Sequence, residues 1–278
     1  MSEQAGRGGQ AGRGEARLRA EHLRLGYEGR VVAEDLSLVV PDGSFTAVVG
    51  PNACGKSTLL RAFSRLLRPQ GGSVLLDGRV LAGYRPKEAA RRIGLLPQSA
   101  SAPEGITVGD LVARGRYPHQ GLVRQWSAAD EVAVADAMVA TGVDELRDRL
   151  VEELSGGQRQ RVWVAVALAQ QTPLLLLDEP TTFLDIAHQV ELLDLFADLH
   201  EAGTTVVAVL HDLGHAARYA THLVVVDAGD VVAAGPPADV LTAELVERVY
   251  GLACVVVPDP VTGTPLVVPR GREERRSR

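Results

Sequence analysis

A glycine-rich segment between an apolar strand and a helix constrains this chain more than any other feature of its sequence. Residues 50–58 read GPNACGKST and fit the pattern G-x-x-x-x-G-K-[ST] of a phosphate-binding P-loop. The apolar run 45–49 precedes the segment, and residues 56–67 have helical character. This strand-loop-helix context predicts an α/β fold with a phosphate site at the turn; a glycine-rich turn without a ligand is the plainer alternative.

Each part of this P-loop has its own task in holding phosphate. The glycines let the backbone wrap around an anion, and the amide groups and the positive end of the helix face it. Lys56 is expected to reach the terminal phosphates, and the hydroxyl of Ser57 to bind Mg²⁺. We expect the whole segment to contact the ligand: Gly50, Pro51, Asn52, Ala53, Cys54, Gly55, Lys56, Ser57 and Thr58.

Two later strand-like runs are followed by residues whose side chains can act as acids, bases or metal ligands. The run 174–177 is followed by Asp178 and Glu179, and the run 206–210 by His211. In a P-loop fold a strand-end aspartate completes the Mg²⁺ shell, and the next residue can hold the attacking water. The carboxyl ends of parallel strands form the ligand-binding edge of a sheet, so we expect His211 there too. Each feature alone is common on protein surfaces, but together with the P-loop they indicate a site.

Strand-like and helix-like patterns alternate along the chain, as expected of one α/β domain. Residues 107–150 lack strand signals and predict an inserted helical subdomain, at about 100–170. Apolar residues recur at helical spacing from Ile186, and Asp185 is suited to cap that helix. The predicted division is a flexible Gly/Arg-rich tail at 1–17, one domain at 18–269 and a basic tail at 270–278.

Charge and composition narrow the class of protein. The 278 residues carry a formal net charge of −6; segments 1–19 and 270–278 contribute +2 and +3, so the residues between carry −11. An acidic body is a poor general binder of nucleic acid, because such binding depends on cations that neutralise phosphates.

The two cysteines have no metal-ligand spacing, and neither a disulfide framework nor a zinc site is expected. The longest apolar run, 162–169, is far shorter than the ~20 residues of a membrane-spanning helix. Without an apolar signal segment, a cytoplasmic chain is the default expectation.

The segment Leu154-Ser155-Gly156-Gly157-Gln158 lies between the P-loop and the carboxylate strand. Alone it could be a helix N-cap with a flexible start. In this order of motifs it resembles the signature of ATP-binding-cassette (ABC) ATPases. The resemblance covers residues from about 18 to 269. It implies a P-loop nucleotide-binding domain with a parallel core sheet, an N-terminal antiparallel β-subdomain and an inserted α-helical subdomain, with ATP and Mg²⁺ as ligands.

The resemblance also implies roles at matching positions. Tyr27 would stack on adenine, Glu179 would be the general base, and His211 would contact the γ-phosphate. Gln98 would approach Mg²⁺ and relay movement to a membrane partner. Residues contributed to the ATP of a second copy would be Ser155, Gly156, Gly157 and Gln158, and Asp185 would belong to the loop that crosses between the copies. The sequence departs from the commonest family forms at Ala53 and at Thr182-Phe183.

The middle and the end of the chain resemble one transporter subgroup. Residues 107–119 (TVGDLVARGRYPH) and 257–269 (VPDPVTGTPLVVP) are similar to ATPases of ferric-siderophore, haem and cobalamin importers. The resemblance implies an ATP-hydrolysing subunit on the cytoplasmic face of a membrane, partnered by a second copy, by transmembrane permease subunits and indirectly by an extracytoplasmic substrate-binding protein. Ferric siderophore is the expected cargo. Cobalamin or haem import, an exporter ATPase and a non-transport ATPase are the alternatives, in that order.

Overall fold

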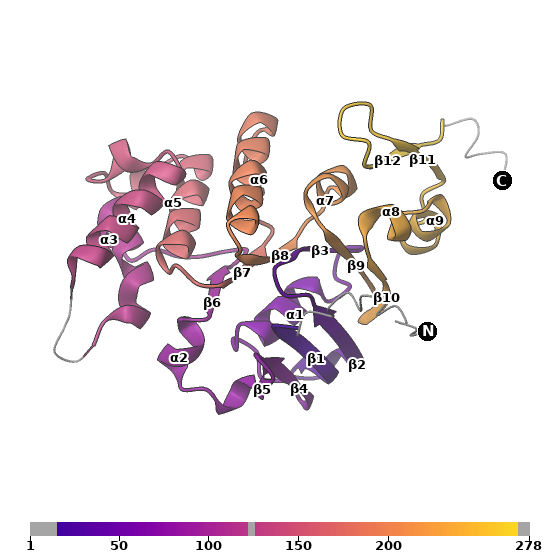
Figure 1. The fold of residues 1–278 in the computed structure, drawn as a ribbon, viewed down its shortest axis with the longest axis horizontal. Coiled ribbons are helices and arrows are strands. Elements are labelled where there is room, and N and C mark those ends of the chain that lie inside the picture. Colours follow the sequence, from indigo (N-terminus) through magenta and orange to yellow (C-terminus); the bar gives the residue numbers. More distant parts are fainter. Residues whose placement is uncertain (1–15, 122–125, 272–278) are drawn as a thin grey trace, which may run out of the picture.

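A computed structural model describes residues 16–121 and 126–271 (Figure 1). A six-stranded sheet in the order β10-β9-β3-β8-β7-β6 forms the centre of this described part. Its strands are β3 (Phe45–Val49), β6 (Ile93–Leu96), β7 (Leu174–Asp178), β8 (Thr205–Val209), β9 (His222–Asp227) and β10 (Asp230–Gly235). The pairs from β9 to β6 are parallel, as expected, whereas β10 pairs antiparallel with β9 at one edge. Strands β3, β7 and β8 are buried throughout, which explains why their sequences are apolar without alternation.

An antiparallel sheet in the order β2-β1-β4-β5 forms a separate layer, the N-terminal β-subdomain implied by the family resemblance. Its strands are β1 (Leu18–Tyr27), β2 (Arg30–Val40), β4 (Gly71–Leu76) and β5 (Arg79–Val80). Buried and exposed residues alternate along most of β2, the pattern of a sheet with one face on the core. Helix α1 (Lys56–Phe63) lies between the two sheets, and its Leu59, Leu60 and Phe63 are buried in the core that they share (Figure 1).

Helix α1 is shorter than the helical stretch expected at 56–67. It ends at Phe63, and Arg65 takes the left-handed conformation with φ 65°. The amide of Leu67 then donates to the carbonyl of Arg61 at 2.9 Å, which ties the turn back to the last part of the helix. The chain needs this turn to reach β4 in the antiparallel sheet, so a tertiary requirement overrides the local helical character.

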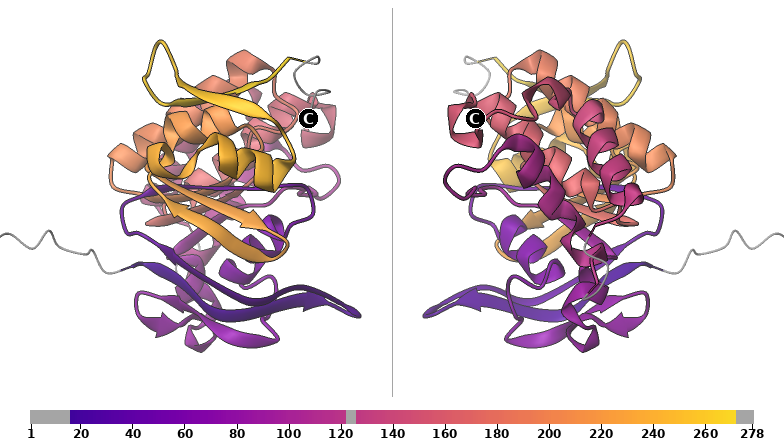
Figure 2. Two further views of the ribbon diagram at one scale, coloured as in Figure 1. Left: turned by 90° about the vertical axis from the view of Figure 1, so that its right-hand side faces the viewer. Right: turned by 90° about the vertical axis from the view of Figure 1, so that its left-hand side faces the viewer.

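Helices α5 (Gly156–Ala169), α6 (Ile186–Glu201), α7 (Leu213–Tyr219) and α9 (Ala243–Tyr250) cover the opposite face of the central sheet, with the short α8 (Pro237–Val240) beside α9 (Figure 1). The C-terminal strands β11 (Cys254–Pro258) and β12 (Pro265–Pro269) pair as an antiparallel hairpin. Figure 2 shows this hairpin and the antiparallel sheet at opposite ends of the molecule. No helix in the described ranges combines the length and the apolar character needed to cross a bilayer.

A group of helices with its own apolar core extends from the β6 edge of the sheet (Figure 1). It contains α3 (Val108–Ala113), the 3₁₀ segment η2 (Arg114–His119), α4 (Ala128–Ala140) and part of α5. A buried ion pair, 2.8 Å from Arg116 Nε to Asp130 Oδ1, joins η2 to α4. The remaining short elements are α2 (Pro86–Ala90), η1 (Leu81–Gly83), η3 (Asp144–Leu146) and η4 (Val151–Glu153). Most of the two terminal segments that the sequence predicts as tails lies outside the described residues.

Candidate nucleotide site

The P-loop joins β3 to α1 at the carboxyl edge of the central sheet. Gly50 has φ 152°, and a Cβ there would lie 2.0 Å from the carbonyl oxygen of Val226, so the close passage of the loop past β9 requires glycine. Gly55, with φ 112°, precedes α1 and no side chain caps the first turn. The amide groups at the start of α1 are therefore available to an anion. Ala53 has φ 61°, which explains why glycine is the more usual residue at this position.

Lys56 lies across the loop that precedes it. Its Nζ donates to the carbonyl oxygens of Gly50 at 2.8 Å and Pro51 at 2.7 Å, and it lies 3.7 Å from the Sγ of Cys54. The lysine is 5% exposed, so its charge is held within the loop by backbone dipoles. A phosphate in the loop would give this ammonium group a negatively charged partner.

A hydrogen bond between Ser57 and Asp178 joins the start of α1 to the end of β7. The Ser57 hydroxyl donates to Asp178 Oδ1 at 2.8 Å, although the residues are 121 positions apart. Burial raises the pKa of the Asp178 carboxyl above its ordinary value, and the neighbouring Glu179 charge adds to the increase, while the hydrogen bond from Ser57 opposes it. A buried carboxylate beside a second carboxylate and a hydroxyl is a fitting ligand set for a divalent cation.

Glu179 follows directly and points toward the end of β8. It has φ 54°, a left-handed conformation that turns the chain sharply after the strand. Its Oε1 lies 2.7 Å from Nε2 of His211, and the side chains are 13% and 48% exposed respectively. The histidine thus fixes the direction of the carboxylate while most of the carboxylate is shielded from solvent.

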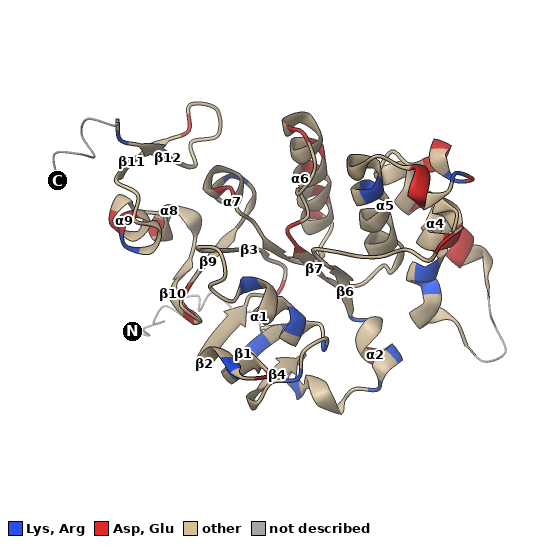
Figure 3. Cartoon of the chain, turned by 180° about the vertical axis from the view of Figure 1, so that it is seen from behind, with Lys and Arg blue, Asp and Glu red and all other residues tan. Residues whose placement is uncertain are grey.

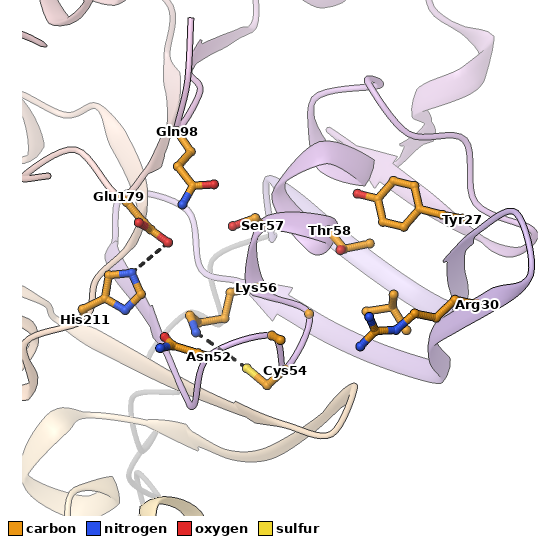
Figure 4. Close-up of a pocket in the computed structure, with 13 residues that line it drawn as sticks. Tyr27, Arg30, Asn52, Cys54, Lys56, Ser57, Thr58, Gln98, Glu179 and His211 are labelled. Atoms are coloured by element: carbon orange, nitrogen blue, oxygen red, sulfur yellow. Dashed lines mark hydrogen bonds and ion pairs between the residues drawn. The ribbon is translucent and has the colours of Figure 1, made fainter.

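Lys56, Ser57, Glu179 and His211 line one cavity of about 850 Å³. Gly50, Pro51 and Asp178, which the sequence also predicts for the site, are not among the described residues that line it. In Figure 4, Glu179, His211 and Gln98 are on one side of the cavity, Tyr27 and Arg30 are on the other, and Lys56 and Ser57 lie between them. The full lining is Tyr27, Arg30, Val32, Asn52, Ala53, Cys54, Gly55, Lys56, Ser57, Thr58, Gln98, Glu179 and His211.

Most of the predicted residues therefore converge on one place, and the structure adds two that the sequence analysis missed. Arg30 and Val32 enter the cavity from β2, directly across a tight turn from Tyr27. The hydroxyl of Tyr27 accepts a hydrogen bond from Nη1 of Arg61 at 2.9 Å, which orients the ring at the cavity edge. The sequence carries one signal for Arg30, Gly29, because a glycine between two strand-like runs is a turn signal.

The second group of predicted residues lies elsewhere. Neither Asp185 nor any residue of the segment 155–158 is among the described residues that line the cavity. Ser155 caps α5, accepting from the amide of Gln158 at 3.2 Å, which is the capping role considered from the sequence. Asp185 caps α6 and also contacts Nδ1 of His188 at 2.8 Å; these hydrogen bonds lower the pKa of its carboxyl.

One side chain connects the helix that begins with the segment 155–158 to the loop that carries Glu179. Gln160 on α5 donates through Nε2 to the carbonyl oxygen of Pro180 at 2.9 Å, and Pro180 directly follows Glu179. A displacement of α5 would therefore act on the backbone of Pro180, next to Glu179, although the segment 155–158 lies outside the cavity.

A strand, a phosphate-binding loop and a helix, in one sheet with a parallel strand that leads into two successive carboxylates, define a P-loop nucleoside triphosphatase. The family model described as ABC transporter matches residues 33–182, which include the P-loop, the segment 155–158 and both carboxylates. The chain belongs to the ABC transporter family and is an ATP-binding, ATP-hydrolysing domain of it.

Relatives match over almost the whole chain. The ferric enterobactin transport ATP-binding protein FepC of Escherichia coli (strain K12) is 58% identical, covering 92% of this chain and 95% of its own length. The probable siderophore transport system ATP-binding protein YusV of Bacillus subtilis (strain 168) is 50% identical, covering 93% and 94%. Hemin import ATP-binding proteins named HmuV match at 44–47% identity.

Solved structures agree with this assignment. An inward-facing transporter assigned to the metal-chelate type has a TM-score of 0.77 at 27% identity, covering 93% of this chain and 99% of that one. The bacterial cassette MJ0796, solved as a dimer, has a TM-score of 0.71 at 25% identity, covering 79% of this chain and 98% of its own. The fold is thus shared by isolated cassettes and by a complete transporter.

Proposed function

We propose that this chain hydrolyses Mg²⁺-ATP in the cavity described above and thereby energises the import of a metal chelate, with ferric siderophore as its cargo. The observation that carries the catalytic part is the convergence of Lys56, Ser57, Asp178, Glu179 and His211 at one sheet edge. The cargo part rests on relatives that are 58% and 50% identical and are named for ferric enterobactin and siderophore transport.

The P-loop amides and Lys56 hold the phosphates of ATP. Ser57 and Asp178 hold Mg²⁺, with Gln98 at the same end of the cavity. The donors fit, because hydroxyl and carboxylate oxygens are what Mg²⁺ prefers, and a cation there favours the ionised form of Asp178 that burial disfavours. When bound, Mg²⁺ neutralises charge on the phosphates during transfer. The ring of Tyr27 supports the adenine at the opposite end of the cavity.

Glu179 accepts a proton from the attacking water. Its carboxylate is mostly shielded, and the contact with His211 at 2.7 Å orients it. The imidazole is about half exposed on the cavity side, so it can also donate to the γ-phosphate when ATP is present. Both groups lie within the cavity that holds Lys56, and the arrangement supports in-line attack on the terminal phosphate.

A second copy of the chain completes the site. The residues 155–158 and Asp185 are ordered at helix starts outside the cavity of their own copy, so they can contact ATP only in the cavity of another copy. A TM-score of 0.71 to a cassette solved as a dimer supports this arrangement. ATP between the two copies then stabilises a closed pair, and hydrolysis removes those contacts.

We assign the permease contact to the seam between α2 and the helical group, on the cytoplasmic face of the membrane. Lys87 on α2 donates to the carbonyl oxygen of Gln120 at 3.0 Å, and Arg91 donates through Nε to that of Pro118 at 2.7 Å. Figure 3 shows Lys and Arg over α1 and α2, and Asp and Glu over α4, α6 and α9. A contact at this seam would couple the helical group to the loop after β6 that carries Gln98. The extracytoplasmic binding protein would act indirectly, through the permease.

The cargo is tested by uptake in cells from which this gene is deleted. We expect loss of uptake of ⁵⁵Fe-labelled siderophore, rescue by the parent chain and no rescue by Glu179→Gln. Labelled haem and cobalamin are measured in the same strains. Loss of haem or cobalamin uptake, with siderophore uptake intact, would replace the proposed cargo.

A further inference from the structure

The loop after α1, the strand β5 and the helix α2 carry a cluster of positive charge in an acidic chain. Residues 65–92 hold seven Lys and Arg and two Asp and Glu, a net charge of +5, whereas residues 20–269 as a whole carry −11. Figure 3 shows Lys and Arg over α2, and Asp and Glu over α6 on the other side of the central sheet. Six of the seven cations are exposed and are called the basic patch below: Arg65, Arg68, Arg79, Arg85, Lys87 and Arg91.

The buried Tyr84 joins these separate elements into one surface. Nη1 of Arg65, in the loop after α1, donates to the carbonyl oxygen of Tyr84 at 3.0 Å. The guanidinium groups of Arg79 and Arg92 lie over its ring, 4.6 and 4.9 Å from the ring centroid. Stacking on an aromatic face holds a guanidinium in place and leaves its charge intact. The three elements therefore present their cations together.

The two acids of this segment do not neutralise the basic patch. Glu88 lies 3.0 Å from Nη1 of Arg92 and 3.8 Å from Nη1 of Arg79. Asp77 lies 3.6 Å from Nε of Arg92. Both acids are thus shared with Arg92, the partly buried cation that is not a member of the patch, and the exposed cations stay in excess.

Arg68 and Arg85 are the members of the patch with no opposite charge beside them. Both are exposed, and neither forms an ion pair with a residue that the structure describes. Arg85 lines a cavity of about 540 Å³ together with three other cations and one acid, Glu88. Near Arg68, the apolar side chain of Leu66 is 65% exposed. Exposed cations around an exposed leucine are typical of surfaces that lie in the headgroup region of a membrane.

We propose that the basic patch lies against the membrane surface and binds the phosphate groups of anionic phospholipids beside the permease. This inference rests on the permease contact proposed above for its direction, because Lys87 and Arg91 belong both to the patch and to the seam between α2 and the helical group.

Charge complementarity favours lipid over the permease as the partner of this patch. Cytoplasmic loops of membrane proteins carry an excess of Lys and Arg, so such loops repel a surface with a net charge of +5. The cytoplasmic leaflet is negative and attracts basic segments that come within a Debye length of it. The exposed Leu66 adds apolar area that is buried at the boundary between headgroups and acyl chains.

The test measures binding of the purified chain to lipid vesicles by co-sedimentation, without permease and without ATP. One set of vesicles is phosphatidylcholine alone, and the other is an equal mixture of phosphatidylcholine and phosphatidylglycerol. We expect binding to the anionic set only. Binding should be lost as NaCl rises from about 0.1 M to about 1 M, because the Debye length falls from about 10 Å to about 3 Å.

A pair of double variants locates the binding on the chain. Arg68→Ala with Arg85→Ala should weaken binding to the anionic vesicles about 25-fold, since each cation at an anionic surface accounts for about fivefold. Arg218→Ala with Arg248→Ala removes the same charge from exposed positions on α7 and α9, and this matched control should bind as the parent does. The arginines of the terminal segments are the same in all variants. Unchanged affinity for ATP shows that each variant is folded.

A loss of at least about fivefold in the patch variant, with the control within about twofold of the parent, supports the proposal. A smaller loss, an equal loss in both double variants, or no preference of the parent for anionic vesicles overturns it. Displacement of the chain by inorganic phosphate at constant ionic strength would make free phosphate the ligand, and binding to duplex DNA without binding to vesicles would make it nucleic acid; either result overturns a membrane role. Because no permease is present, these results are independent of the uptake experiment that tests the proposed function.

Discussion

Replacement of Glu179 by Gln tests the chemistry assigned to this cavity most directly. The two side chains have the same size and shape, and the amide oxygen of glutamine can still accept from Nε2 of His211, which lies 2.7 Å from the carboxylate in the parent. The 2.8 Å bond between Ser57 and Asp178 does not involve Glu179. The substitution therefore removes a proton acceptor and leaves the phosphate and Mg²⁺ positions in place.

The expected magnitude follows from that single loss. A positioned general base contributes about 10²–10⁴ to a rate, which corresponds to about 3–5 kcal/mol in the activation barrier. We expect kcat for ATP hydrolysis to fall by that factor, while the dissociation constant of ATP changes by less than about threefold. A selective loss of this kind is what removal of a transition-state interaction produces.

Two measurements on the purified chain are needed. Phosphate release under saturating Mg²⁺-ATP measures kcat, and calorimetric titration measures ATP affinity. Glu191→Gln, at an exposed acid on α6, controls for the loss of one negative charge. If Glu179→Gln keeps more than about one tenth of the parent kcat, Glu179 is not the general base. If instead ATP affinity falls in parallel with kcat, the residue holds the ligand and does not activate water.

Three further perturbations test other parts of the structure. Lys56→Ala should weaken ATP binding about 10- to 100-fold in calorimetry, because a hydrogen bond from a charged group is lost. Lys87→Ala on α2 is the control and should leave the affinity unchanged. If both variants bind ATP equally well, Lys56 does not hold the phosphates. Mg²⁺ binds the ionised form of Asp178, and burial raises the pKa of this carboxyl above the ordinary 3.8. On acidification, Asp178 therefore takes up its proton at a higher pH than a solvated aspartate does, and we expect the affinity for Mg²⁺ to begin to fall at that higher pH. A pH-independent affinity would contradict this, and Asp178→Asn should remove the dependence. Asp130→Asn leaves the buried charge of Arg116 without its carboxylate and should lower the free energy of unfolding by about 3 kcal/mol in urea titrations; a loss below about 1 kcal/mol would show that the pair is dispensable.

The residues that the sequence grouped correctly share a simple geometry. Lys56 and Ser57 follow one buried strand, Asp178 and Glu179 end another, and His211 follows a third. Parallel strands place their carboxyl ends at one edge of the sheet, so the order of motifs was sufficient to predict a common site. Capping of α6 by Asp185 was equally predictable, because an N-cap depends on residues within one turn.

Other features depend on contacts between distant parts of the chain. Arg30 enters the cavity because β2 folds back on β1, α1 ends early because the chain must reach β4, and β10 is antiparallel because a tight turn follows β9. Periodicity in a short window carries no information on such pairings.

The amino-acid sequence by itself determined the α/β class, the phosphate loop and the chemical groups of the site, because each depends on neighbouring residues or on the direction of parallel strands. Only the tertiary structure decided that the segment 155–158 lies outside its own cavity and that Phe183 faces solvent at a left-handed position. Apolar character predicts burial on average, but which apolar residue stays exposed is decided by how the surrounding loop is tied to the elements around it.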